Sequence, residues 1–133
     1  MKNFKLLIVI AFIFLASCEL DPSHVVYNNA IGYITSYSIP STGKVGETLS
    51  IAAMGEAYSD CWKDLKISLD KSTDKKYVLM ARGYYESYGS CNPATISVDT
   101  TIAFKPETAG DYVISIIKSQ SEILFDTIVV TTP

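Results

Sequence analysis

The stretch Leu65-Lys66-Ile67-Ser68-Leu69-Asp70 alternates apolar and polar residues without a break. A period of two is typical of a β-strand that buries one face and exposes the other. The polar run Lys71-Ser72-Thr73-Asp74-Lys75 follows at once, and a second β-prone segment covers residues 77–85. The sequence therefore predicts a β-hairpin whose loop lies at residues 71–75.

Similar short segments, separated by turn residues, recur along the rest of the chain. No stretch carries the i, i+3, i+4, i+7 apolar stripe of an amphipathic helix. The other expected strands cover residues 31–39, 48–53, 96–104, 112–116 and 123–130. In the first of them we expect Tyr33, Tyr37 and Ile39 to share one face. Seven or eight short strands are typical of an all-β, two-layer sandwich.

Length and composition bound the remaining choices. The chain has 133 residues, of which 48% are hydrophobic and 19% charged, with a formal net charge of −3. This is enough for one sizeable core, and the composition excludes a disordered tail, a coiled coil and a collagen-like repeat. The acidic balance argues against a nucleic-acid partner, which favours a basic surface.

The N-terminus has the pattern of a secretion signal. Lys2 and Lys5 precede an unbroken apolar run over residues 6–16. As a helix this run is about 16 Å long, whereas the bilayer core is about 30 Å thick. We therefore expect residues 1–17 to be a signal peptide, residues 18–30 a tether, and residues 31–133 the folded domain.

The end of the apolar run, Leu15-Ala16-Ser17-Cys18, resembles the lipobox of bacterial lipoproteins. The resemblance implies that the leader is cut before Cys18 and that this cysteine is acylated, so the membrane is a partner through lipid. Glu19 stands where an aspartate would resemble an inner-membrane retention signal. The expected location is therefore the outer membrane, on its periplasmic side or at the cell surface. A plain secreted protein with a chance cysteine is the alternative.

If Cys18 carries lipid, two cysteines remain in an exported, oxidising compartment. We therefore expect a disulfide between Cys61 and Cys91. Closing a loop of about 30 residues would stabilise the fold by roughly 3–4 kcal/mol on the chain-entropy model.

The run Pro106-Glu107-Thr108-Ala109-Gly110-Asp111-Tyr112-Val113-Ile114 is similar to the corner before strand F of immunoglobulin-like domains. The resemblance implies an immunoglobulin-like β-sandwich in which the Tyr112 hydroxyl bonds the backbone upstream. Ile114 stands where antibody domains have a cysteine, so the bridge typical of those domains is not expected. An ordinary turn before a strand with a buried tyrosine is the alternative.

Motifs that carry chemistry are missing from the sequence. There is no phosphate-binding glycine loop, and the one histidine, His24, lies in the expected tether. Asp70 and Asp74 are better explained as an exposed loop than as calcium ligands. We therefore expect no catalytic residue, cofactor or metal. A hydrolase using two carboxylates among Asp60, Asp64 and Glu86 is the least favoured alternative.

Aromatic residues gather around the expected disulfide. Trp62, Tyr84, Tyr85 and Tyr88 are the candidates for a ligand surface, because aromatic rings with polar handles suit glycan or protein ligands. Tyr84 and Tyr85 are adjacent, so in a strand their rings must point to opposite faces. The alternative is that Trp62 belongs to the core and the tyrosines only cover the sheet.

These observations favour a lipid-anchored, non-catalytic binding module of the cell envelope with a protein or glycan ligand. A structural accessory subunit of an outer-membrane assembly is the alternative, and an exposed apolar patch would favour it.

Overall fold

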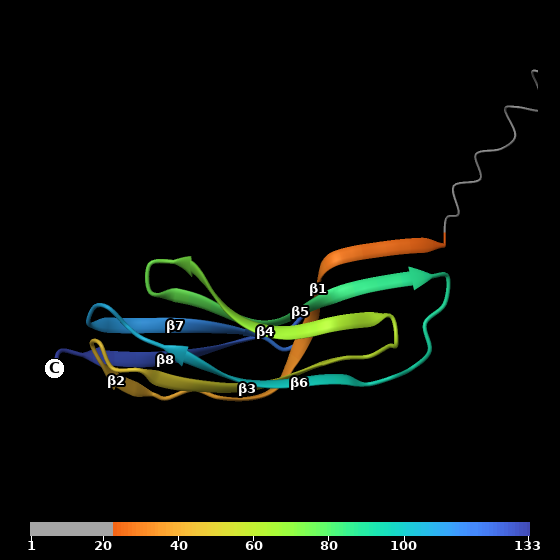
Figure 1. Ribbon diagram of the computed structural model, residues 1–133. Coiled ribbons are helices and arrows are strands. Elements are labelled where there is room, and N and C mark those ends of the chain that lie inside the picture. The colour runs from red at the N-terminus through yellow and green to blue at the C-terminus, as the bar shows by residue number, and fades with distance from the viewer. Residues whose placement is uncertain (1–22) are drawn as a thin grey trace, which may run out of the picture.

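The computed structural model describes residues 23–133, so the expected signal peptide and Cys18 lie outside the described residues. This part of the chain is all-β, as the sequence predicts, and has eight strands (Figure 1). They are β1 (His24–Ser38), β2 (Thr42–Lys44), β3 (Leu49–Ala57), β4 (Trp62–Thr73), β5 (Lys76–Tyr88), β6 (Ile96–Phe104), β7 (Gly110–Ile117) and β8 (Ile123–Thr131). Between residues 23 and 133 there is no helix of the length and apolarity needed to cross a bilayer.

The strands form one curled, mixed sheet in the order β2-β8-β7-β5-β1-β3-β6, and β4 pairs with β5 outside this path. The predicted hairpin is confirmed, because β4 and β5 pair antiparallel. Its loop is shorter than the expected residues 71–75, because β4 continues to Thr73 and only Asp74 and Lys75 form the turn, in which Lys75 has a φ of 55°. Two pairs, β2–β8 and β5–β7, are parallel. The other neighbouring strands run antiparallel.

Strand β1 connects the two parts of this sheet. Its residues 24–32 pair with β5, and its residues 33–38 pair with β3. In Figure 1 it runs beside β5 and then descends to the layer of β3 and β6. The expectation of a tether up to residue 30 is therefore wrong from His24 onward, because β5 supplies a partner for this segment.

A bulge in β1 also changes which residues face the core. The register with β3 shifts between Ile34 and Ser36, so the alternation of inward and outward side chains changes phase there. Ile34 is buried with 1% exposure, whereas Tyr33 is only half-buried. The expectation that Tyr33 shares a face with Tyr37 and Ile39 is therefore wrong.

Elsewhere the predicted alternation produces the core. Every second residue is buried in β3 and in the inner part of β7. This is the pattern of strands that bury one face. The fully buried aliphatic side chains of the core are Ile34, Ile51, Leu79, Ile114, Ile116 and Ile128.

The corner before β7 has the hydrogen bond that the sequence predicts. The Tyr112 hydroxyl donates to the carbonyl oxygen of Thr108 at 3.0 Å, and the Thr108 N–H donates back to that hydroxyl at 3.3 Å. Gly110 has a φ of +127°, which L side chains rarely adopt. The buried Tyr112 ring also packs edge-on against Phe104, with centroids 5.4 Å apart.

Candidate functional site

A groove arises where one edge of β5 changes its partner. Residues 76–79 of β5 pair with β7, and residues 81–88 pair with β1. Both partners lie on the same edge, because β4 pairs with these parts of β5 from the other side. The outer edge of β7 carries β8, but within residues 23–133 no strand pairs with the outer edge of β1 over residues 24–32. A longer β8 would lie beside residues 24–32 of β1, and this position is therefore open.

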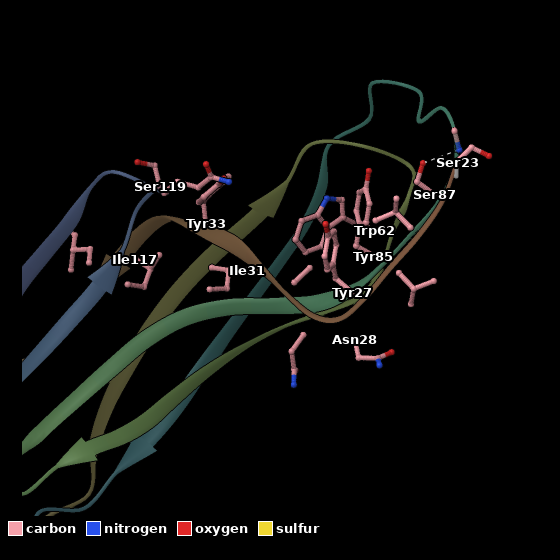
Figure 2. Close-up of a pocket in the computed structure, with 17 residues that line it drawn as sticks. Ser23, Tyr27, Asn28, Ile31, Tyr33, Trp62, Tyr85, Ser87, Ile117 and Ser119 are labelled. Carbon is pink, nitrogen blue, oxygen red and sulfur yellow. Dashed lines mark hydrogen bonds between the residues drawn. The ribbon is translucent and has the colours of Figure 1, made fainter. Parts of the chain in front are cut away.

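This open position is a groove of about 1170 Å³, shown in Figure 2. Every residue from 25 to 31 lines it. A groove on one face of the strand would be lined only by alternate residues, because successive side chains point to opposite faces. The groove therefore runs along the edge of β1. The other residues that line it are Ser23, Tyr33, Trp62, Tyr85, Ser87, Gly89, Ile117, Ser119, Gln120 and Ile123.

Three aromatic rings form one end of the groove. Tyr85 lies directly opposite Trp62 on β4 and opposite Tyr27 on β1 in the strand registers. Its ring centroid is 5.7 Å from that of Trp62 and 5.9 Å from that of Tyr27. Gly83 leaves room for the indole, because a Cβ there would lie 3.3 Å from a Trp62 ring carbon and 3.0 Å from the Lys63 carbonyl. The result is a row of aromatic side chains across three strands (Figure 2).

Among residues 23–133, the lining of the groove includes no Asp, Glu, Lys, Arg or His. The alternation of β5 explains this, because Arg82 and Glu86 point to the opposite face from Tyr85 and Ser87. Neutral groups remain, namely amides, hydroxyls, aromatic rings and aliphatic side chains. The groove therefore suits an uncharged ligand, and tyrosine is the only side chain of general acid–base type among its described lining residues.

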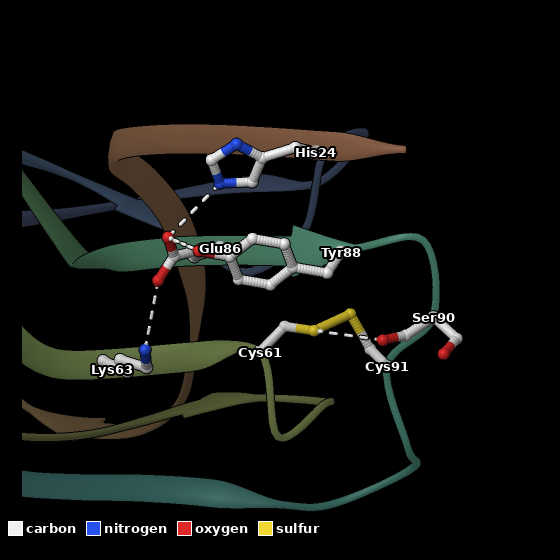
Figure 3. Close-up of polar contacts among 7 residues, drawn as sticks. All are labelled: His24, Cys61, Lys63, Glu86, Tyr88, Ser90 and Cys91. Atoms are coloured by element: carbon white, nitrogen blue, oxygen red, sulfur yellow. Dashed lines mark hydrogen bonds and ion pairs between the residues drawn. A yellow bond between two sulfur atoms is a disulfide. The ribbon is translucent and has the colours of Figure 1, made fainter. Parts of the chain in front are cut away.

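The charged groups gather on the opposite face, around Glu86 (Figure 3). Its carboxylate accepts the Tyr88 hydroxyl at 2.9 Å, lies 3.2 Å from Lys63 Nζ and lies 3.3 Å from His24 Nε2. The hydrogen bond from Tyr88, followed by those from Lys63 and His24, holds the pKa of the Glu86 carboxyl below its ordinary value. The same carboxylate raises the pKa of Lys63 and of Tyr88. Glu86 thus links three strand ends, β1, β4 and β5.

The four candidate aromatic residues divide between the two faces. Trp62 and Tyr85 line the groove. Tyr84 lies on the other face, with Lys63 Nζ 6.0 Å from its ring centroid, as the adjacency of Tyr84 and Tyr85 predicts. Tyr88 stacks on His24 with ring centroids 4.4 Å apart. The structure therefore does not bring the four together as one surface.

Residues 25–31 were missed as site residues, because residues 25–30 fall in the expected tether and Ile31 was predicted only as the start of a strand. The β-prone sequence Val25-Val26-Tyr27 was the available signal, but it is short and shows no alternation. Their position depends on pairing with residues of β5 about sixty positions later. Neither Asp60, Asp64 nor Glu86 lines the groove.

The predicted disulfide between Cys61 and Cys91 is confirmed. Beside it, Asp60 accepts hydrogen bonds from the backbone N–H and the side-chain amide of Asn92, at 2.9 and 2.7 Å. The sulfur atoms lie near Asp60. Sulfurs bonded to each other offer no thiolate to a metal ion. The Tyr85 hydroxyl lies 3.3 Å from the Cys91 sulfur, so the disulfide supports the aromatic end of the groove.

Fold and groove together define a disulfide-bonded all-β protein with an uncharged groove at a strand edge. Comparison of the chain with protein-family models, with curated proteins and with solved structures finds no match.

Proposed function

We propose that this chain is a lipid-anchored, non-catalytic binding module of the bacterial cell envelope, and that its ligand occupies the groove beside β1. The observation that carries the proposal is the groove itself: it is large, aromatic at one end, and its lining within residues 23–133 includes no Asp, Glu, Lys, Arg or His. Exposed Tyr27 and Ile31, at 59% and 52%, offer apolar surface to a ligand.

The proposed location rests on two independent features. The leader and Leu15-Ala16-Ser17-Cys18 resemble a lipoprotein signal. The Cys61–Cys91 disulfide supports export, because such bonds persist in oxidising compartments. Glu19 favours the outer membrane over the inner membrane, with the domain in the periplasm or at the cell surface.

This anchor would hold the domain close to the membrane. Only five residues separate Cys18 from His24, the first residue of β1. Even fully extended, they let His24 move only about 20 Å from the acylated residue. The end of the domain with His24, Tyr88 and the disulfide would therefore face the lipid, and the Ile123 end of the groove would point away.

For the fold, we propose an immunoglobulin-like sandwich with two departures. One is that β1 also pairs with β5, which joins the two layers into a single sheet, and the other is the partner of β7. The neighbours β1-β3-β6 and β8-β7-β5 match the positions of strands A-B-E and G-F-C, and the Tyr112–Thr108 hydrogen bond supports the resemblance at the corner. In immunoglobulin domains both sheets are antiparallel. Here β7 pairs in parallel with β5, the second strand of the hairpin, rather than with β4.

A structural accessory subunit is the second candidate function. It is favoured by apolar side chains exposed along β8, above all Phe125 with 69% exposure and Ile123 with 49%. A partner subunit that packs on β8 would cover them.

Fluorine NMR tests the binding function. Trp62 is the only tryptophan, so the mature protein labelled with 5-fluorotryptophan gives one signal, and that signal comes from the groove. We expect it to shift when the soluble envelope fraction of the producing cells is added. Tyr27→Ala should abolish the shift, and Tyr88→Ala, on the opposite face, should preserve it. A signal that no fraction moves, or that moves equally in Tyr27→Ala, would overturn the proposal.

A further inference from the structure

We infer that the ligand of the groove is an extended, uncharged segment of another polypeptide, which adds as a strand to the open edge of β1. This inference rests on the proposed function and names the chemical class of its ligand. Strand addition at an exposed sheet edge gives affinity through main-chain hydrogen bonds and specificity through alternate side chains.

A strand added to β1 would continue the existing sheet. β8 lies beside β7, and β7 is followed along the edge of β5 by β1. A ligand strand beside residues 25–31 would continue the row that β8 begins at Ile123, a residue that lines the groove. The open length is about 23 Å, enough for a strand of ordinary length.

The edge of β1 is accessible from both sides. Asn28 and Asn29 line the groove and also the cavity on the opposite face that contains Tyr84. The register with β5 shifts between Tyr27 and Ala30, so these two asparagines lie at a bulge, outside the regular β5 ladder. The backbone groups here that point away from β5 are placed for another strand.

The edge of β1 carries few of the features that guard edge strands. Natural edge strands are commonly protected by lysine, proline, inward-pointing charges or β-bulges. Residues 25–31 contain no lysine, proline or charged residue, and their one such feature is the bulge between Tyr27 and Ala30. β4, in contrast, is an edge strand that carries Lys63, Lys66 and Lys71.

The lining indicates the side chains of the ligand. A charged residue would lose hydration in the groove without finding an opposite charge among the lining residues of the described chain, 23–133. Tyr27, Trp62 and Tyr85 would contact an apolar side chain at one end, and Ile31, Ile117 and Ile123 one at the other. A glycan would match the aromatic end, but it would not form the repeated main-chain hydrogen bonds that the open strand edge of β1 offers, so we favour a polypeptide.

The test uses the mature protein in detergent micelles and a phage-displayed library of random 12-residue peptides. We expect enrichment of uncharged sequences with apolar residues at alternate positions. The best binder is then measured against matched variants at the bulge. Asn28→Ala and Asn29→Ala keep the backbone N–H, whereas Asn28→Pro and Asn29→Pro remove it. Neighbouring N–H groups of a strand point to opposite edges, so we expect one of the proline variants to weaken binding about tenfold. Both alanine variants should stay close to the wild type.

A second readout leaves the protein unchanged. Two forms of the binder are made, each N-methylated at one set of alternate residues. Strand pairing predicts that one form loses binding and the other keeps it, because only one edge of the ligand faces β1. Any one of three results would overturn the inference. They are equal binding by both N-methylated forms, equal binding by the folded proline and alanine variants, and no enrichment of any peptide.

These failures differ from a failure of the proposed function. If the Trp62 fluorine signal responds to a glycan fraction while no peptide is enriched, the groove binds a ligand and the inference about its class is wrong. If the fluorine signal responds to nothing, both are wrong. Self-association of the mature protein that is lost in the proline variants would assign the edge to a second copy and overturn the inference as stated.

Discussion

Tyr27 lies directly opposite Tyr85 in the β1–β5 ladder, with ring centroids 5.9 Å apart. This pair joins a strand at the N-terminus of the described chain to the disulfide region, because Tyr85 also contacts Trp62 and the Cys91 sulfur. Such cross-strand aromatic pairs stabilise a sheet. The pair therefore fixes β1 in place and forms part of the wall of the groove.

The Cys61–Cys91 disulfide should contribute substantially to stability. Its sequence separation is 30 residues, and the chain-entropy model gives roughly 3–4 kcal/mol for a loop of that size. We expect the double substitution Cys61→Ser, Cys91→Ser to lower the free energy of unfolding in urea by about this amount. Reduction of the wild type should have the same effect and leave the double variant unchanged. A loss well below 1 kcal/mol would contradict the prediction.

The contacts of Glu86 predict a dependence of stability on pH. Its pKa is lowered in the folded protein, chiefly by the Tyr88 hydroxyl and then by Lys63 and His24. The carboxylate therefore stabilises the fold above its unfolded pKa, and the contribution is lost as the pH falls through the lower folded value. We expect Glu86→Gln to reduce the urea midpoint at pH 7 more than at pH 3.

The matched control for this prediction is Glu107→Gln, because Glu107 is exposed. It should change the urea midpoint little at either pH. If Glu86→Gln and Glu107→Gln behaved alike at pH 7, the hydrogen bonds to Glu86 would not stabilise the fold.

The hydroxyl of Tyr112 should matter more than that of an ordinary half-buried tyrosine. Tyr112→Phe removes the bond to the Thr108 carbonyl oxygen and should destabilise the fold by about 1 kcal/mol. Tyr37→Phe is the control, because the Tyr37 hydroxyl forms no hydrogen bond within residues 23–133. Thermal unfolding of both variants checks the prediction, and equal midpoints would argue against a stabilising corner.

The proposed lipid anchor predicts the mass of the extracted protein. We expect residues 1–17 to be absent, Cys18 to carry acyl chains, and the mass to be two hydrogens lower than that of the dithiol. Cys18→Ala should release the protein from membranes. Intact-mass spectrometry with membrane fractionation checks both points. A protein that keeps its leader and an unmodified Cys18 would contradict the proposed location.

The sequence alone predicts a strand and its inner face correctly where the strand buries one face against the core. Leu49, Ile51 and Ala53 alternate with exposed residues in β3, and Tyr112, Ile114 and Ile116 do so in β7. In these strands local periodicity and tertiary burial agree, so the pattern identifies both the strand and its inner face. The disulfide was also predictable, from cysteine count and compartment alone.

The groove could not be predicted in the same way. The exposed part of β1 has no alternation to detect, and the bulge near Thr35 changes which side chains point inward. The groove forms because β5 continues beyond residues 76–79, where it pairs with β7, and then pairs with β1. This is a property of long-range strand pairing. Strand parity alone separates Tyr84 from Tyr85, but it does not say which of the two faces the ligand site.

Site-specific photo-cross-linking in the producing cells tests the central claim most directly. The photoreactive residue p-benzoylphenylalanine replaces Tyr27 in the groove or, as the control, Lys71 near the β4–β5 turn. The account predicts a discrete adduct with another polypeptide from position 27 and none of that mass from position 71. No adduct from position 27, or the same adducts from both positions, would contradict the claim that the groove beside β1 is the ligand site.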